Sequence, residues 1–243
     1  MDHLDPPFAV DLGIIIVSYN NSDLLRKCLK SIPDACPNLR YAVSVVDNAS
    51  PDDSVEMVRG EFPKVQLTAS NENLGFARAN NLQMEMSTAE FVLLLNPDTE
   101  PYTGSLALLV DFMRQHPEAG VVGPKLLNTD GSIQLNGRLF PGVWREFLAV
   151  SGLRRFNIDG YNRKYQYGRA DFDRTCEVDE VSGACLLIRR TAMEKVGVLD
   201  PIFFMFYEEI EYCWRVKKGG WKVFYVADAL VTHHWMGSVK KSS

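Results

Sequence analysis

The first hundred residues alternate between short apolar runs and segments with helical spacing. Runs of apolar and β-branched residues at 12–17, 41–46, 65–69 and 91–95 are each followed by a polar turn. Continuous apolar runs of this length are typical of strands buried on both faces, as in a parallel sheet covered by helices. The order β-α-β-α-β-α-β therefore predicts an α/β fold with right-handed crossover connections.

Helix boundaries in this half are predicted from proline and from capping residues. The first helix is expected to run from 22 to 32 and to end at Pro33, which has no backbone N–H to donate. A second helix is expected to begin at Ser50, because Ser50 and Asp53 have the spacing of a capping box. The third helix is expected to bury an apolar face formed by Phe76, Ala79, Leu82 and Met86.

The remainder of the chain shows a less regular succession of elements. The elements predicted there are a helix at 104–116, a strand at 120–123, a hairpin at 125–133, a strand at 177–190, a helix at 208–218, and strands at 222–226 and 229–232. The turn of the hairpin is expected at Thr129-Asp130-Gly131. This half is therefore expected to extend the sheet without repeating the βα pattern.

Polar side chains gather where the four predicted strands of the first half end. Because the carboxyl ends of parallel strands meet at one edge of a sheet, we expect these side chains to line one crevice, where ligands of open α/β sheets bind. They are Asp47, Asn48, Asn73, Asn80, Asn81, Asn96 and Asp98. The same residue types are common in caps and turns, so the pattern predicts a site without identifying its chemistry.

Asp98 is the most informative of these residues. The strand at 91–95 must end before Pro97, which leaves Asn96 and Asp98 on a turn at the crevice. A carboxylate beside an amide suits a divalent cation, which can in turn bind phosphate, although Asn-Pro-Asp also forms an ordinary turn. The glycine-rich fingerprints of dinucleotide-binding folds and P-loop NTPases are absent from the sequence, which favours a cation as the phosphate binder.

Composition narrows the function classes further. The net charge of −5 argues against nucleic acid as a partner. The five cysteines are odd in number and lack C-x-x-C spacing, which favours free thiols in a reducing compartment over disulfides or zinc. Acidic residues near Met1 and the lack of a long apolar run predict neither a signal peptide nor a membrane span. We therefore expect a cytoplasmic protein.

Seven segments, taken in order, resemble one known family. They are IIIVSYN, VVDNASPDDS, NENLGFARANN, LLLNPD, VSGACLLIRR, FFMFYEEIEYCWR and VTHHWMGS. Together they resemble the inverting glycosyltransferases of family 2, which have the GT-A fold, and most closely the rhamnosyltransferase-like branch. The resemblance extends from Leu12 to Ser238 and implies a single GT-A domain over 1–243, with a nucleotide-sugar half at 10–123 and an acceptor half at 124–238.

The resemblance also implies ligands and roles. The donor would be a nucleotide-diphospho-sugar, with dTDP-rhamnose suggested by the branch, and the cofactor would be Mg²⁺ or Mn²⁺. The nucleoside would be held by Ser18, Tyr19, Asn20 and Asp47. The sugar-diphosphate side would be lined by Asn73, Gly75, Asn80 and Asn81.

Further roles follow from the same resemblance. Asn96 and Asp98 replace the D-x-D metal motif of the family, so metal binding would rest mainly on Asp98. Gly183 would form the floor beneath the donor sugar and the acceptor, and His233 or His234 would be a second metal ligand. The acid pair that opens the helix at 208–218 is Glu208-Glu209, and Glu209 would be the catalytic base, with Glu208 as its rival.

The span 138–174 is basic and aromatic, with eight basic residues against four acidic ones. It is interpreted either as a solvated excursion or as an acceptor-side flap on an anionic membrane surface. Resembling enzymes often use a lipid-linked saccharide acceptor, such as a polyprenyl-linked one, which favours peripheral contact with the inner face of the plasma membrane.

Two other functions fit parts of the pattern. A sugar-1-phosphate nucleotidyltransferase shares the sheet and the nucleotide site, but the turn after the first strand, Ser18-Tyr19-Asn20-Asn21, lacks the Gly-rich, Arg-containing loop expected of that class. A non-catalytic module that binds nucleotide sugars or polysaccharide would not need the acidic positions, which are intact. Inverting sugar transfer is therefore the main hypothesis.

Overall fold

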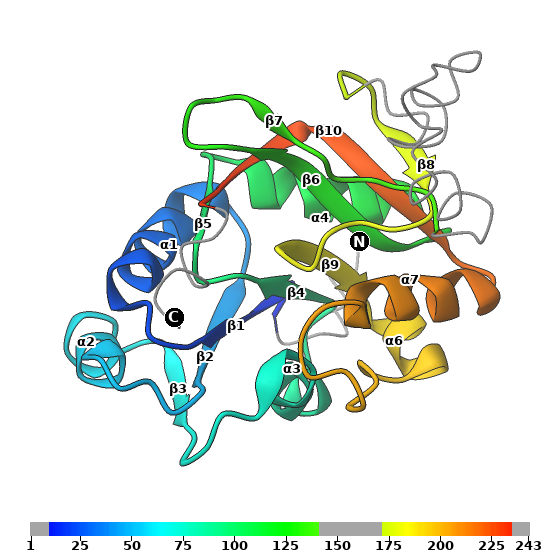
Figure 1. Ribbon diagram of the computed structural model, residues 1–243. Coiled ribbons are helices and arrows are strands. Elements are labelled where there is room, and N and C mark those ends of the chain that lie inside the picture. The colour runs from blue at the N-terminus through cyan, green and yellow to red at the C-terminus, as the bar shows by residue number, and fades with distance from the viewer. Residues whose placement is uncertain (1–9, 141–171, 235–243) are drawn as a thin grey trace, which may run out of the picture.

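The computed structural model describes residues 10–140 and 172–234, and the strands of this part form one ten-stranded sheet (Figure 1). The strands are β1 Leu12–Ser18, β2 Tyr41–Asp47, β3 Gln66–Ala69, β4 Phe91–Leu95, β5 Thr99–Pro101, β6 Ala119–Leu127, β7 Ile133–Gln134, β8 Cys176–Val178, β9 Cys185–Arg189 and β10 Lys222–His233. The described helices are α1 Ser22–Ala35, α2 Ser54–Glu61, α3 Gly75–Met86, α4 Ser105–Gln115, α6 Arg190–Val196 and α7 Glu208–Lys218.

The sheet has a parallel half and a mixed half. Its order is β3-β2-β1-β4-β9-β6-β10-β5, with β7 paired to β6 and β8 paired to β10. The first four strands are parallel, as predicted. β9 runs antiparallel to both β4 and β6 and so joins the two halves, while β6 and β10 are parallel to each other. The predicted α/β fold class is confirmed, and the second half of the sheet is mixed because β9 and β5 run antiparallel to the strands that they pair with.

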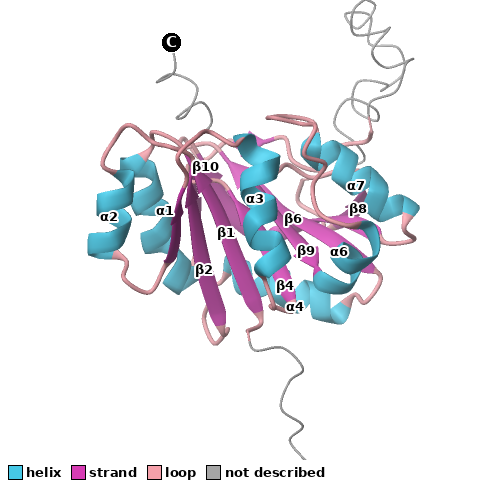
Figure 2. Cartoon of the chain, turned by 90° about the horizontal axis from the view of Figure 1, so that it is seen from below, coloured by secondary structure: helices cyan, strands magenta, loops and turns pink. Residues whose placement is uncertain are grey.

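Strand residues alternate between two cores, one on each face of the sheet. In β4, Phe91, Leu93 and Leu95 belong to one core, whereas Val92 and Leu94 belong to the other. Helices α1, α2 and α4 contribute to the first core, and α3, α6 and α7 contribute to the second, so both faces of the sheet are covered (Figure 2). This arrangement explains the continuous apolar runs. None of the helices in the described part is long and apolar enough to cross a bilayer.

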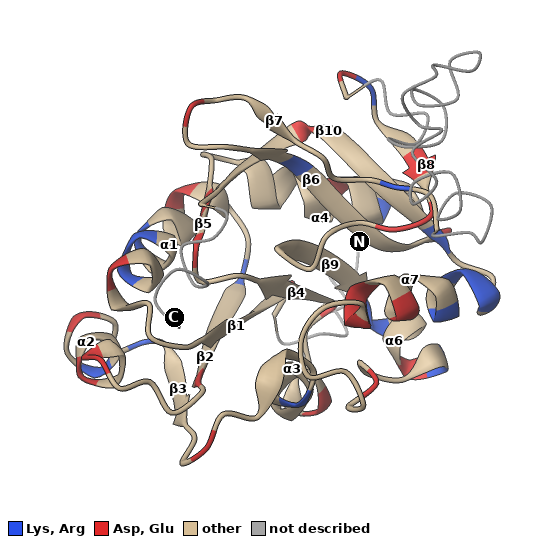
Figure 3. Ribbon diagram, in the orientation of Figure 1, with Lys and Arg blue, Asp and Glu red and all other residues tan. Residues whose placement is uncertain are grey.

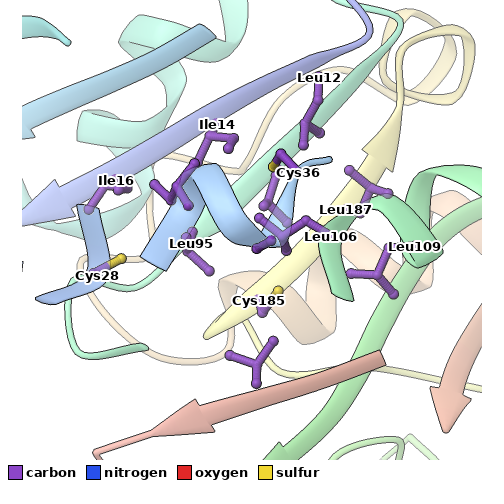
Figure 4. Packing of buried hydrophobic residues seen from close by; sticks show 14 of the residues in the cluster. Leu12, Ile14, Ile16, Cys28, Cys36, Leu95, Leu106, Leu109, Cys185 and Leu187 are labelled. Carbon is purple, nitrogen blue, oxygen red and sulfur yellow. The ribbon is translucent and has the colours of Figure 1, made fainter. Parts of the chain in front are cut away.

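The thiols are divided between these two cores. Cys28, Cys36 and Cys185 pack with leucine and isoleucine side chains of β1, β4, β9 and α4 in the first core (Figure 4). Cys213 lies in the second core, fully buried in α7. Burial raises the pKa of Cys28, Cys36 and Cys213 to about 12. Cys28, Cys36, Cys185 and Cys213 form no disulfide.

Two predicted helix boundaries are wrong. Pro33 lies inside α1, which continues to Ala35. The helix tolerates it because a proline in the last turn removes only one hydrogen bond, and the N–H of Cys36 still donates to the carbonyl of Ile32. α2 begins at Ser54 rather than at Ser50. The Ser50 hydroxyl instead accepts a hydrogen bond from the backbone N–H of Asn20, so it joins two turns rather than capping a helix.

The predicted apolar face of α3 is confirmed at Ala79, which is fully buried, but is wrong at Leu82 and Met86. Leu82 and Met86 are 42% and 65% exposed, and the buried side of the helix carries Asn80, Asn81 and Gln83. Asn81 donates to the carbonyl of Leu199 at 2.7 Å and accepts from its N–H at 3.0 Å. Asn81 faces inward because its amide satisfies backbone groups of a distant loop, while Gln83 donates to the Thr68 hydroxyl.

Two predicted strand assignments in the second half need correction. The single strand expected at 177–190 is two strands, β8 and β9, because a turn at Gly183-Ala184 separates them. The two strands expected at 222–226 and 229–232 are one strand, β10, with an irregularity in its pairing to β6 between Val226 and Leu230. The hairpin turn at Thr129-Asp130-Gly131 is confirmed.

Asn81→Leu should lower the free energy of unfolding by about 2–4 kcal/mol, because it leaves the buried N–H and carbonyl of Leu199 without partners. Denaturant titration followed by circular dichroism measures this change. Leu82→Ala, at the exposed neighbouring position, is the control and should shift stability by no more than about 0.5 kcal/mol. Unchanged stability of Asn81→Leu with lost donor affinity would instead assign Asn81 to ligand binding.

Candidate active site

The turns after β1 and β2 are held together by their own polar groups. Ser18 and Asp47 are paired in register, and the N–H of Asn48 donates to the carbonyl of Ser18 at 2.8 Å. One Asp47 carboxylate oxygen accepts from the N–H of Ser50 at 3.0 Å, while Oδ2 is buried and has no hydrogen-bond partner within the described residues. The hydroxyl of Ser18 is in the same situation. This corner therefore offers a buried carboxylate oxygen and a hydroxyl to a ligand.

Two other predicted nucleoside residues flank this corner. Tyr19 is 42% exposed, directly after Ser18. Asn20 has a φ of 54°, in the left-handed region that asparagine tolerates better than most residues. Its backbone N–H donates to the Ser50 hydroxyl, so a hydrogen bond links the turn after β1 to the turn after β2. Four predicted nucleoside residues, Ser18, Tyr19, Asn20 and Asp47, thus lie together.

The start of α3 is tied to the turn after β2. Asn48 donates from Nδ2 to the carbonyl of Gly75 and accepts from the N–H of Leu74, while Asn73 accepts from the N–H of Gly75. Gly75 has a φ of +76°, and a Cβ there would lie 2.6 Å from the carbonyl oxygen of Phe204. Only glycine permits this conformation and this close approach without strain.

Asn80 and Asn81 are buried, and both side-chain amides have partners within the protein. Asn80 donates to the carbonyl of Phe76, one turn back in α3, and Asn81 holds Leu199. Both amides are therefore engaged with the backbone of the protein itself, and their assignment to the donor remains a prediction.

The turn after β4 brings Asp98 next to one histidine. The side chain of Asp98 is 6% exposed, and its Oδ1 lies 3.4 Å from Nε2 of His233. His234 points elsewhere, with Nε2 at 2.6 Å from Oε1 of Glu100, while its backbone N–H donates to the carbonyl of Asp98. The pairing of β5 with β10 produces this arrangement, because consecutive strand residues alternate in direction.

Asp98 and His233 could hold a divalent cation only with help from the ligand. A carboxylate oxygen is a ligand for both Mg²⁺ and Mn²⁺, whereas an imidazole nitrogen suits a transition-metal ion such as Mn²⁺ better than Mg²⁺. Within residues 10–140 and 172–234 there is no group of three or more His, Cys, Asp or Glu side chains arranged for a metal. Two protein ligands therefore fit a cation that completes its coordination with diphosphate oxygens and water.

Two carboxylates open α7, as predicted. Figure 3 shows the acidic first turn and the basic last turn of this helix, an arrangement that complements its dipole. Burial and the neighbouring Glu209 raise the pKa of Glu208 to about 7, and burial also raises the pKa of Glu209. One oxygen of each carboxylate is buried without a hydrogen-bond partner among the described residues. Such carboxylates are suited to proton transfer near neutral pH.

Glu209 and the end of β4 both lie beside the Gly183-Ala184 segment. A Cβ at Gly183 would lie 3.7 Å from Cβ of Glu209 and 3.8 Å from the ring of Phe76. The next residue, Ala184, accepts from the backbone N–H of Asn96 at 2.9 Å. Gly183 thus lies between Glu209 and the turn that carries Asp98, and its role as a floor beneath the sugar stays a prediction. Glu208, the other acid of the pair, is buried, with 5% of its surface exposed.

The sequence reasoning missed two buried amides, Gln134 and Asn136. Asn136 accepts from the N–H of Ser182 at 2.7 Å and donates to the carbonyl of Pro124, which holds the segment before Gly183. The sequence shows only that apolar and polar residues alternate over 133–136. The structure adds that the polar residues are buried and that the apolar Ile133 and Leu135 are exposed. An alternation with its polar side inward indicates a site rather than a core strand.

Most of the basic, aromatic span lies outside the described residues. Residues 138–140 and 172–174 are described, whereas 141–171 are not. The membrane flap therefore stays a prediction.

Known proteins resemble this chain in sequence. The family model described as Glycosyl transferase family 2 matches residues 13–197. An N-acetylglucosaminyl-diphospho-decaprenol L-rhamnosyltransferase of Mycobacterium tuberculosis is 30% identical, over 92% of this chain and 76% of its own. A low-salt glycan biosynthesis hexosyltransferase of Haloferax volcanii is 27% identical, over 86% of this chain and 62% of its own.

Solved structures of glycosyltransferases share the fold. GalNAc-T7 with UDP, GalNAc and Mn²⁺ superposes with a TM-score of 0.69 at 15% identity, over 93% of this chain and 44% of its own. Residues 1–349 of S. aureus TarS in complex with UDP give a TM-score of 0.64 at 16% identity, over 91% of this chain and 60% of that one. The expected GT-A fold is thereby confirmed. With a family model matched over most of its length, the chain is a glycosyltransferase and belongs to glycosyl transferase family 2.

Proposed function

We propose that this protein transfers a hexosyl group, with rhamnose from dTDP-rhamnose as the first candidate, to a hydroxyl of a lipid-linked saccharide with inversion. The observation that carries the proposal is the convergence of three predicted groups at one sheet edge. Asp98 faces His233 and follows Asn96, whose N–H donates to the carbonyl of Ala184. Gly183, next to Ala184, lies close to Glu209. A phosphate-binding cation site and a carboxylate base are the two parts that inverting transfer from a nucleotide sugar needs.

The donor would be recognised first by its nucleoside. The unpartnered Oδ2 of Asp47 suits an N–H or O–H donor of a base or ribose, because a carboxylate only accepts hydrogen bonds. Tyr19, exposed beside it, offers a ring surface to the base. Asp98 and His233 would hold the cation, which when bound offsets negative charge on the diphosphate.

The reaction would be a single displacement. Glu209 would accept the proton of the acceptor hydroxyl as its oxygen forms a bond to the anomeric carbon. The bond between that carbon and the diphosphate oxygen breaks, and the nucleoside diphosphate leaves. Attack on the face opposite the leaving group inverts the anomeric configuration. The buried surroundings that raise the pKa of Glu209 make its carboxylate a stronger base than an exposed one.

The acceptor would approach over the loop before α7. Five large apolar side chains of this loop are exposed, namely Ile202, Phe204, Met205, Phe206 and Tyr207. Such a patch next to a carboxylate pair suits an acceptor with an apolar part. The M. tuberculosis relative, whose name specifies a decaprenol-linked substrate, supports a lipid-linked saccharide as the acceptor.

A panel of nucleotide sugars tests this proposal. With Mn²⁺ or Mg²⁺, one donor should raise the melting temperature by mass action and release nucleoside diphosphate slowly, and faster when a polyprenyl-linked N-acetylglucosamine is added. Binding without any release over hours would indicate a non-catalytic module. Pyrophosphate release from a nucleoside triphosphate and a sugar-1-phosphate would indicate the nucleotidyltransferase and overturn the proposal.

A further inference from the structure

The imidazole of His233 rests on a buried glutamine. Gln134, in β7, is 5% exposed, and its Oε1 lies 2.9 Å from Nδ1 of His233. Its Nε2 donates to the carbonyl of His233 at 2.6 Å and to Oδ1 of Asn128 at 2.7 Å. The amide thus contacts both the ring and the backbone of the same histidine.

A chain of hydrogen bonds from the hairpin turn fixes the direction of this contact. The carboxylate of Asp130 can only accept, so the Ser132 hydroxyl donates to it at 2.6 Å. That hydroxyl then accepts from Nδ2 of Asn128 at 2.8 Å, which leaves Oδ1 of Asn128 as an acceptor for Gln134. The hydrogen bond from Ser132 also lowers the pKa of Asp130, which keeps the carboxylate ionised.

The direction of the chain determines the tautomer of His233. Because Nε2 of Gln134 faces two oxygen acceptors, its Oε1 must face Nδ1 of His233 and accept the proton carried there. A neutral ring with its proton on Nδ1 has its lone pair on Nε2. That lone pair faces Oδ1 of Asp98 at 3.4 Å. Two acceptors in this position repel each other unless a positive charge lies between them.

We propose that Gln134 is a positioning residue, which holds His233 in the Nδ1–H tautomer so that Nε2 and Asp98 together are ready for a divalent cation. This inference rests on the cation site of the proposed function. Asp130, Ser132, Asn128 and Gln134 form a relay that runs from the β6–β7 turn to the metal side of the site. The relay explains why polar residues occupy the inward side of this short strand.

Nitrogen-15 NMR of the histidine side chains tests the tautomer on the native, metal-free protein. At pH 8, His233 should show the chemical shifts of a protonated Nδ1 and an unprotonated Nε2. A ring protonated on Nε2, or on both nitrogens at pH 8, would overturn the proposal. This measurement does not depend on activity, so it separates a failure of the relay from a failure of the proposed transferase function.

A pair of variants tests the link to the cation. Gln134→Leu should move the proton of His233 to Nε2 and weaken Mn²⁺ binding in the presence of nucleoside diphosphate by about 10–100-fold, the usual loss for an outer-shell partner. Mn²⁺ binding is measured by electron paramagnetic resonance titration. Ile133→Ala, at the exposed neighbouring position of β7, is the control and should change neither the tautomer nor the affinity. Native Mn²⁺ affinity in Gln134→Leu would also overturn the proposal.

Discussion

Asp98→Asn should abolish cation-dependent binding of the donor and lower the transfer rate by about 10³-fold, because a cation on the leaving diphosphate supplies several kcal/mol. The fold should persist, since asparagine has nearly the same shape. The backbone carbonyl of Asp98, which accepts from the N–H of His234, is also unchanged by the substitution. The measurements are calorimetry of nucleoside diphosphate with and without Mn²⁺, and circular dichroism for the fold.

The neighbouring acid and histidine provide a matched control. Glu100 lies against His234 in the same way that Asp98 lies against His233, two residues away in the chain. Glu100→Gln should therefore leave Mn²⁺-dependent binding close to native, whereas His233→Ala should weaken it and His234→Ala should not. If Asp98→Asn still shows a Mn²⁺-dependent gain in donor affinity, Asn-Pro-Asp is an ordinary turn and the cation lies elsewhere.

Glu209→Gln should lower turnover by about 10²–10⁴-fold with donor affinity nearly unchanged, which is the contribution expected of a general base. Glutamine keeps the size of the side chain and removes its ability to accept a proton. Single-turnover transfer at saturating donor measures the rate, and calorimetry measures the affinity. Adjacent helical residues point about 100° apart, so only one member of the Glu208-Glu209 pair can face the acceptor squarely.

Glu208→Gln is the companion variant, with a different expected signature. The pKa of Glu208 is raised from 4.5 to about 7, so the folded protein binds more protons than the unfolded chain between these values. Stability is therefore lost as pH rises through this window, and the loss should be smaller in Glu208→Gln. A dead Glu208→Gln enzyme beside an active Glu209→Gln enzyme would exchange the two assignments. Near-native turnover in both would remove α7 from the mechanism.

The first half of the fold could be predicted from the sequence because its signal is local. The runs at 12–17 and 91–95 are apolar at every position, and both strands proved to be buried on both faces. Polar turns after parallel strands must then share one edge, which correctly brought Ser18 next to Asp47. These inferences need only periodicity and strand direction.

The errors in α3 and the omissions around His233 have a common physical cause. Asn81 bonds to a residue 118 positions away, and Gln134 to one 99 positions away. Hydrogen bonds of this kind leave no periodic trace, so the inward face of α3 and the support of His233 were invisible to pattern analysis. The choice between His233 and His234 likewise depended on the pairing of β5 with β10, which no local signal reveals. Tertiary satisfaction of buried amides overrode the apolar pattern at these positions.

Because buried thiols lie in both cores, the rates at which they are chemically modified report how often each core opens. A thiol with a pKa of about 12 inside a packed core is inert to alkylating reagents, which attack the thiolate. Cys28 becomes accessible only when the α1 face opens, and Cys213 only when the α7 face opens. If the nucleotide-sugar half and the acceptor half unfold as one cooperative unit, an alkylating reagent should modify the two cysteines at the same rate. If the acceptor half opens separately, Cys213 is modified before Cys28. The difference between the two alkylation rates then shows that the two halves open independently.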